Sequence, residues 1–280
     1  MIAILGGFGA AVAWATSTLC SSRSTRILGP ATALAWVMIV GLLITLPPSL
    51  AGPWPEFTPS VVTAMGVSGV TNVLGLLLAY GALRLGKVAV IAPILSTEGA
   101  IAAAIAIGAG EQVAPAALAI LAAISVGIVF ASRGPGEAAT SDADSRAVLL
   151  AISGAAMFGI NLYLTGWLGS AVPVAWAVLP ARVFGSLMIA LPLAVVGRLW
   201  LTRRAATLVV VVAIAEVAGT VSLALGARDG IAIASVLAAQ FGGIAAIVAF
   251  VLFRERLART QVAGVITIAL GVGLLSAIRA

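Results

Sequence analysis

The chain has 280 residues, of which 62% are hydrophobic and only 9% are charged, and its mean hydropathy is +1.22. A soluble domain carries roughly 25% charged residues, so this composition excludes a water-covered surface and predicts a multi-pass membrane protein. The formal net charge is +6, but the Lys and Arg residues stand in short loops, where they orient membrane proteins, so we expect no nucleic-acid partner. With no His and one Cys, Cys20, an internal disulfide and a His/Cys metal site are excluded.

Ten segments are long and apolar enough to cross ~30 Å of hydrocarbon as helices of about 20 residues. In chain order they are residues 2–20, 29–50, 59–82, 88–108, 114–132, 147–168, 172–196, 205–226, 230–252 and 260–278. The first segment has no basic stretch before it and no clear cleavage site, so we interpret it as a spanning helix rather than a signal peptide.

The two halves of the chain are repeats of each other. Residues 84–111 align without a gap with residues 228–255, an offset of 144. Five glycine pairs share this offset, where about one or two are expected by chance from 31 glycines. The pairs are Gly41 and Gly185, Gly75 and Gly219, Gly86 and Gly230, Gly99 and Gly243, and Gly127 and Gly271.

The repeat predicts the domain organisation. Residues 1–132 form one five-helix repeat, residues 133–146 a polar linker loop, and residues 147–280 the second repeat. Because five is odd, the second repeat enters the membrane in the opposite orientation, which is the plan of many secondary transporters. The predicted fold is therefore an all-α membrane protein with ten transmembrane helices in two inverted five-helix repeats.

The distribution of Lys and Arg predicts the orientation. The loops after the first, third, fifth, seventh and ninth spans hold twelve of these residues, whereas the other loops and the C-terminus hold only Arg228 and Arg279. The positive-inside rule puts the first set in the cytoplasm and both termini outside. We expect the cell (inner) membrane. The twelve residues are Arg23, Arg26, Arg84, Lys87, Arg133, Arg146, Arg198, Arg203, Arg204, Arg254, Arg256 and Arg259.

Short motifs recur at fixed places of this ten-helix pattern. They are Trp14-Ala15, Ala92-Pro93, Gly110-Glu111, Arg254-Glu255-Arg256-Leu257, Gly127 and the region 264–271. With these motifs the duplicated pattern resembles the drug/metabolite transporter superfamily, and within it the EamA-type transporters, over nearly the whole chain. One departure is visible, since Leu237 stands where the first repeat has Pro93, and this argues against a symmetric movement of the fourth and ninth helices.

Three charged residues, Glu98, Arg182 and Glu216, fall deep inside predicted spans, about ten residues from either end. A charge at this depth costs on the order of 3 kcal/mol, so each should face a cavity or a partner. In one interpretation Glu98 or Glu216 binds a proton or a cationic substrate, while Arg182 holds the other acid or a substrate carboxylate. In the other interpretation a static Glu–Arg pair fixes the packing. Glu98 is the preferred proton site because it follows Pro93, which permits a kink.

Neutral polar and aromatic residues at similar depth are candidates for lining the cavity. Asn72 is the repeat equivalent of Glu216, and Ser96 is the equivalent of Gln240. Each of these residues has an alternative role as a hydrogen-bond or packing partner between helices. Glu111 and Glu255 are expected at helix starts, where a carboxylate favours the helix dipole, or in pairs with Arg84 and Arg228. The cavity-lining candidates are Trp14, Asn72, Ser96, Thr97, Asn161, Tyr163 and Gln240.

The resemblance implies a secondary transporter, an exporter of small metabolites or drugs that works by alternating access, and proton coupling is one way to drive it. No nucleotide-binding motif is present, so we expect no direct use of ATP, and we expect no cofactor. The lack of His argues against an enzyme. An uncoupled facilitator, a lipid flippase or a membrane scaffold remains an alternative. The expected partners are a small-molecule substrate and the bilayer, and the expected state is a monomer.

Overall fold

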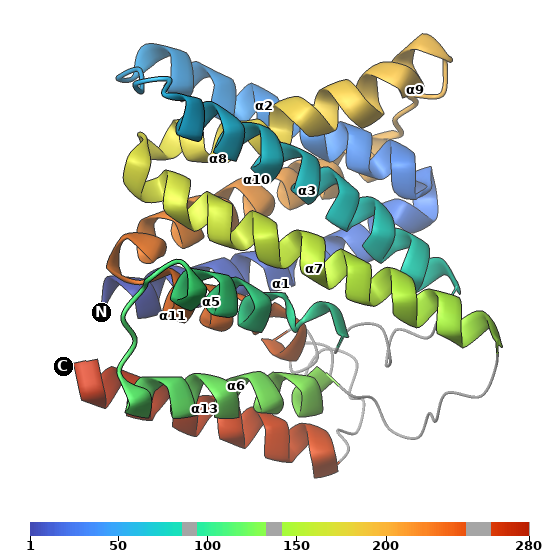
Figure 1. The fold of residues 1–280 in the computed structure, drawn as a ribbon. Coiled ribbons are helices and arrows are strands. Elements are labelled where there is room, and N and C mark those ends of the chain that lie inside the picture. Colours follow the sequence, from blue (N-terminus) through green and yellow to red (C-terminus); the bar gives the residue numbers. More distant parts are fainter. Residues whose placement is uncertain (86–93, 133–141, 245–258, 280) are drawn as a thin grey trace.

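The structure is a computed structural model that describes residues 1–85, 94–132, 142–244 and 259–279 (Figure 1). Within these residues the regular secondary structure is helical throughout, with no strand. The helices are α1 (Ile2–Leu28), α2 (Pro30–Ala51), α3 (Pro59–Leu85), α5 (Glu98–Gly108), α6 (Pro115–Ser132), α7 (Asp142–Ala171), α8 (Val174–Gly185), η1 (Ser186–Ala190), α9 (Leu191–Val195), α10 (Arg203–Gly226), η2 (Ala227–Asp229), α11 (Ile231–Ala238) and α13 (Arg259–Arg279).

Six helical segments in the described part of the chain are long and apolar enough to cross a membrane. They are Ile2–Leu28, Pro30–Ala51, Pro59–Ala79, Ser145–Ala171, Val174–Val195 and Arg203–Asp229. The predicted all-helical, multi-pass class is therefore confirmed.

The four other predicted spans contain shorter or partly described helices. Glu98–Gly108, Pro115–Phe130 and Ile231–Ile244 lie within the predicted spans 88–108, 114–132 and 230–252, and α13 lies over 260–278. Residues 86–93, 133–141 and 245–258, which include Pro93, Glu255 and most of the predicted linker, are outside the described residues. The count of ten spans remains a prediction.

Several helix ends differ from the predicted boundaries. α1 continues to Leu28, so Arg23 and Arg26 lie on its last turns rather than in a loop, and α7 begins at Asp142, inside the range predicted for the linker. The seventh predicted span contains a π-helical turn, η1, just before Pro192. Pro192 has no N–H to donate, and a wider turn before it lets the backbone accommodate the missing bond.

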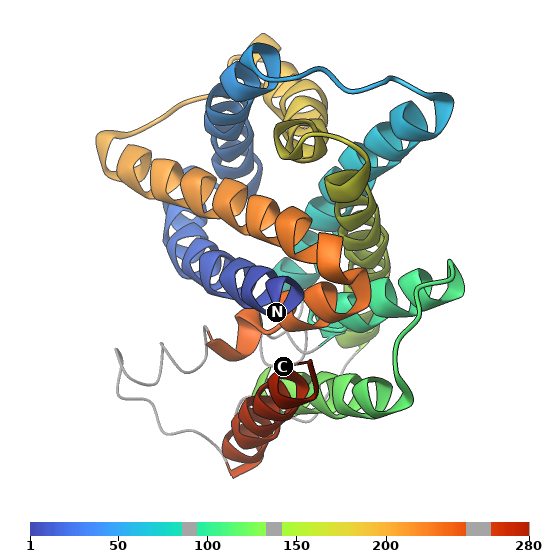
Figure 2. The same cartoon turned by 90° about the vertical axis from the view of Figure 1, so that its left-hand side faces the viewer.

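Met1 and the end of α13 lie on the same face of the molecule, which we call the terminal face (Figures 1 and 2). The turns 52–58, 109–114 and 227–230 lie on this face too, and the turn 196–202 lies on the opposite face (Figure 1). An even number of crossings places the two ends together in this way.

The main contacts between helices are repeated: when each helix is replaced by its equivalent at the 144-residue offset, one contact becomes another that is also present. α1 packs against α10 and α7 packs against α3, and in each pair a first helix of one half meets a third helix of the other. In the same way α2 packs against α8, and α6 against α13. The two halves of the chain are thus interleaved rather than set side by side.

The duplicated glycines lie where these helices cross. A Cβ built on Gly41 of α2 would lie 2.9 Å from Cδ of Arg182, and one on Gly185 of α8 would lie 2.5 Å from Cγ of Met38. Met38 is the repeat equivalent of Arg182. Equivalent side chains, Met38 of α2 and Arg182 of α8, therefore each pack against the glycine of the other helix. Neither glycine position has room for a larger residue.

The same exchange occurs at the second glycine pair. A Cβ on Gly219 of α10 would lie 2.5 Å from Nε1 of Trp14, and one on Gly75 of α3 would lie 2.7 Å from Cδ1 of Phe158. Trp14 and Phe158 are themselves equivalent at the 144-residue offset. The repeated glycines thus reflect repeated close approaches between the two halves of the chain.

Candidate functional site

A polar cluster joins the last turn of α8 to the middle of α1 and α10. Ser17 donates a hydrogen bond from Oγ to Oε1 of Glu216 at 2.6 Å, and Nη2 of Arg182 lies 3.8 Å from Oε2 of the same carboxylate. The Arg182 side chain is only 2% exposed and that of Glu216 is 27% exposed. The sequence left open which acid pairs with Arg182, and the structure pairs it with Glu216.

Arg182 makes further contacts that hold its guanidinium in place. Nη2 donates to Oγ1 of Thr220 at 3.4 Å, and Nη1 lies 3.7 Å from the sulfur of Met38. Its Nε has no hydrogen-bond partner among the described residues. The ion pair is long and one donor is unused, so the guanidinium is not saturated by the protein groups that surround it.

Glu98 is the other acid at this depth, and its environment differs from that of Glu216. It is the first residue of α5 and is 6% exposed. Within the described residues its carboxylate makes no hydrogen bond or ion pair, and it is close enough to Glu216 for the two charges to repel each other. The start of a helix favours a negative charge, but this helix is short, and the burial is expensive.

Glu98 lies directly after a break in the fourth predicted span. Ser96 and Thr97 form a turn, and the N–H of Thr97 donates to the carbonyl of Ile94 at 3.1 Å, three residues back. The hydroxyl of Thr97 donates to the same carbonyl at 2.6 Å. Both donors of Thr97 are thus bonded within the turn, and the residue stabilises the helix break.

The ninth predicted span breaks at nearly the same repeat position. Ala239 and Gln240 form a turn, and the N–H of Gln240 donates to the carbonyl of Leu237 at 3.3 Å. Leu237 stands where the first repeat has proline, a difference that argued against a symmetric movement of the fourth and ninth helices. The second helix breaks without a proline, so the difference in sequence does not remove the break.

The two breaks lie side by side. A Cβ built on Gly99 would lie 2.6 Å from the carbonyl oxygen of Ser235 and 2.6 Å from Cβ of Ala239. The first turn of α5, which carries Glu98, therefore rests on the last turn of α11. Broken helices that meet at mid-depth bring backbone dipoles and polar side chains to one place, as in many transporter sites.

Several buried polar atoms around the breaks have no partner among the described residues. They include Oγ of Ser96, Nε2 of Gln240 and Oγ of Ser235, and each of these residues is at most 3% exposed. A buried polar atom without a partner costs about 1–3 kcal/mol, so such a group indicates a bound water or ligand. Sequence reasoning missed Ser235, whose only signal is its polar type within the apolar helix α11.

Two other cavity-lining candidates, Trp14 and Asn72, also have unsatisfied atoms. Nε1 of Trp14 and Oδ1 of Asn72 are buried without a hydrogen-bond partner in the described structure. Trp14 lies on Gly219, three residues from Glu216. Asn72 is the repeat equivalent of Glu216 but, unlike it, makes no bond to the polar residue at the position equivalent to Ser17.

Asn161 and Tyr163 have other surroundings than the unsatisfied groups. Oδ1 of Asn161 accepts hydrogen bonds from Ser68 at 2.9 Å and from Thr165 at 3.4 Å, which ties α7 to α3. Asn161 thus has the alternative role considered above, a hydrogen-bond partner between helices. Tyr163 contributes to a separate cavity.

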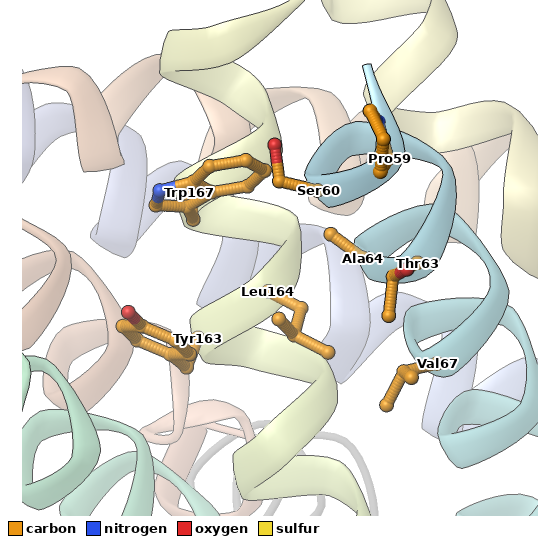
Figure 3. A pocket seen from close by; sticks show the side chains of 8 residues that line it. All are labelled: Pro59, Ser60, Thr63, Ala64, Val67, Tyr163, Leu164 and Trp167. Atoms are coloured by element: carbon orange, nitrogen blue, oxygen red, sulfur yellow. The ribbon is translucent and has the colours of Figure 1, made fainter. Parts of the chain in front are cut away.

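That cavity, of about 500 Å³, lies between the first turns of α3 and the last turns of α7 (Figure 3). Glu98, Arg182 and Glu216 are not among its lining residues, and its walls are mainly apolar. It is therefore distinct from the charged cluster, and its chemistry offers little beyond apolar contact. Its lining residues are Pro59, Ser60, Thr63, Ala64, Val67, Tyr163, Leu164 and Trp167.

An all-helical chain with several membrane-spanning helices and buried charges at mid-depth has the features of a polytopic transport protein. Residues 1–133 match the model of the EamA-like transporter family. The match covers just under half of the chain, and the matched family is part of the drug/metabolite transporter superfamily. The first half of the chain is thus similar to membrane transporters of that type.

The comparison with solved structures agrees in fold. A structure described only as "Crystal structure of protein" superposes with a TM-score of 0.80 and 17% sequence identity, over 99% of this chain and 96% of that chain. It is one of 25 solved chains that match. At this identity the likeness concerns the fold alone. No curated protein matches the sequence.

Proposed function

We propose that the chain is a secondary transporter that exports a small metabolite or drug by alternating access, with its substrate site at the two helix breaks. Residues 1–132 and 147–280 are the two inverted five-helix repeats in this proposal. The exchanged pairs of helix contacts and the equivalent glycine crossings support it. The protein works as a monomer without a cofactor, and its site lies within one chain.

The observation that carries the proposal is that the two buried acids, Glu98 and Glu216, differ in their hydrogen-bond and ion-pair partners. Arg182 and Ser17 satisfy Glu216, whereas Glu98 is buried without a partner among the described residues. A carboxylate in this setting is neutral when it holds a proton and costly when it does not. Glu98 therefore binds the proton that drives transport, and the Arg182–Glu216 pair shapes the site beside it.

The unpartnered atoms of Ser96, Gln240, Asn72 and Trp14 supply hydrogen bonds to the substrate. They include both donors and acceptors, which suits a small polar solute rather than a bare ion. Ser235 adds a further hydroxyl that the sequence analysis did not include.

The orientation is also part of the proposal. The basic residues at the ends of α1, α10 and α13 (Arg26, Arg203 and Arg259) lie on the face opposite the termini (Figure 1). The positive-inside rule then makes that face cytoplasmic and the terminal face external, in the inner membrane.

The test is a comparison of two transport modes in proteoliposomes. Growth-resistance screening against amino-acid analogues, nucleobases and cationic drugs first identifies a substrate. Glu98→Gln, which mimics the protonated acid, is expected to abolish uphill transport driven by a pH gradient while exchange of substrate down its own gradient survives. Glu56→Gln, which alters an exposed carboxylate in the loop before α3, is the matched control and keeps both modes.

Normal uphill transport in the Glu98→Gln variant would refute the proton role. Loss of both modes in a folded variant would make Glu98 a substrate ligand, which a binding assay would show. Wild-type transport that ignores the pH gradient would favour the uncoupled facilitator, and no solute transport at all would favour the flippase or scaffold.

A further inference from the structure

Glu111 connects the two halves of the chain at the terminal face. Its carboxylate accepts hydrogen bonds from the backbone N–H of Ile231 at 3.1 Å and of Ala232 at 3.2 Å, using both oxygens. These are the first two residues of α11. Glu111 follows α5, so the cap of this helix comes from 120 residues away and from the other repeat.

The local backbone fixes Glu111 in position. The N–H of Glu111 donates to the carbonyl of Ala106 at 3.0 Å, and the N–H of Gly110 donates to that of Ile107 at 3.0 Å. Gly110 has a φ of 102°. These are the bonds of a Schellman motif, which requires glycine at this position and holds the next residue at the end of the helix. The turn therefore presents the Glu111 side chain in a defined direction.

α11 has no cap of its own. Its N-cap residue is Gly230, which lacks a side chain, whereas α10 is capped locally by Thr202, whose Oγ1 accepts from the N–H of Ala205. The first N–H groups of a helix need an acceptor. If the repeats separate at this face, two donors of α11 lose theirs at once. The contact thus opposes separation in a way that a local cap would not.

The helix held in this way runs from the terminal face to the break in the ninth predicted span. Residues 232–240 are all buried, and they include Ser235 and Gln240 at the break. We infer that Glu111 is a positioning residue of the transport cycle, whose carboxylate latches the first repeat to α11 and keeps the terminal face closed. This inference rests on the proposed alternating access. It adds the contact that must break when the terminal face opens.

Access to the site can be measured by labelling of a thiol. In a Cys20→Ala background, Ser235→Cys places a thiol in the buried part of α11 with little change in size. Its reaction with a membrane-impermeant maleimide is followed by mass spectrometry in nanodiscs. We expect Glu111→Ala to raise the labelling rate about fivefold, the factor in an opening equilibrium that corresponds to the usual loss of one helix cap. Glu111→Gln, which keeps one acceptor oxygen, should give a smaller increase.

A second pair of variants separates a latch from a plain helix cap. Ile231→Pro removes one of the N–H groups that Glu111 accepts from, yet proline is favourable at the first position of a helix. Ile231→Ala loses the same side-chain packing and keeps the N–H. If Glu111 is a latch, the thiol at position 235 reacts faster in Ile231→Pro than in Ile231→Ala. If Glu111 serves only the stability of α11, proline reacts no faster than alanine.

Glu56→Ala, which removes an exposed carboxylate from a loop of the same face, is the control and should leave the labelling rate unchanged. Unchanged labelling in folded Glu111→Ala, or equal rates in the two Ile231 variants, would overturn the inference. The assay needs neither substrate nor proton gradient. A failure of the carrier function therefore appears in the transport assay, and a failure of the latch appears only here.

Discussion

Removal of Arg182 should destabilise the protein by leaving Glu216 without its cation. Arg182→Met keeps an unbranched side chain of similar length over Gly41 and matches Met38 at the equivalent position. Breaking a buried ion pair by removing one partner costs about 3–5 kcal/mol. Here Glu216 keeps the 2.6 Å bond from Ser17 and is 27% exposed, so water screens part of its charge, and we expect about 2 kcal/mol.

The second substitution decides the pairing. Glu216→Gln removes the unpaired charge, keeps an acceptor for Ser17, and should restore most of the lost stability when combined with Arg182→Met. Glu98→Gln in the same background should restore much less, because Glu98 makes no ion pair with Arg182. The free energy of unfolding is measured by titrating purified protein with sodium dodecyl sulfate in mixed micelles. Equal rescue by the two glutamine variants would show that the reasoning on the pair is wrong.

Two further predictions concern packing and orientation. Gly219→Ala should lower the free energy of unfolding by about 1–3 kcal/mol, because its Cβ would lie 2.5 Å from Nε1 of Trp14, and Trp14→Ala in the same chain should relieve most of this cost. Gly66→Ala, with nothing within 4 Å of its Cβ, is the control and should be neutral or stabilising. Thermal unfolding in detergent compares these variants. A C-terminal fusion to a fluorescent protein that folds only in the cytoplasm should be dark, and a fusion to a periplasmic phosphatase should be active; the opposite pattern would reverse the proposed topology.

The positions of the helices could be predicted because they depend on apolar length alone. Each spanning segment must satisfy its own backbone in lipid, so a run of about 20 apolar residues predicts a helix wherever it occurs. The ends were less predictable. The basic residues Arg23 and Arg26 looked like a loop by charge, but α1 continues through them to Leu28, since a helix can leave the membrane and continue into water.

The partners of polar residues could not be predicted in the same way. Sequence placed Glu98, Arg182 and Glu216 at one depth, but which acid meets Arg182 depends on how α8 and α10 are rotated about their axes. The glycine at position 41 and the crossing of α2 over α8 set that rotation. The break after Leu237 was missed for a related reason. Proline predicts a kink from local chemistry, whereas a break without proline depends on tertiary contacts.

The hydrogen-bond partners of Glu111 could not be predicted from the residues near it in the sequence. Its place before the fifth span suggested a carboxylate that favours the dipole of the next helix, or a partner for Arg84. The structure places its carboxylate at the start of α11, in the other half of the chain. Arg228 bonds the carbonyl of Gly169 through Nε at 2.7 Å. Contacts between distant segments, such as these two, have no signal in either sequence segment taken alone.

The interior charges are not repeated in the two halves of the chain, whereas the packing contacts are. Arg182, Glu216 and Glu98 have the uncharged equivalents Met38, Asn72 and Gly242.

The close contacts at the duplicated glycines are, by contrast, nearly the same in both halves. A duplicated scaffold whose halves pack alike can exchange their conformations at low cost, which alternating access requires. A site with charges from unequal positions does not look the same from the two faces of the membrane. In the proposed alternating access, the scaffold accounts for the movement and the departures from the repeat account for what is bound. We therefore expect substitutions at the charged positions to change transport more than they change the fold.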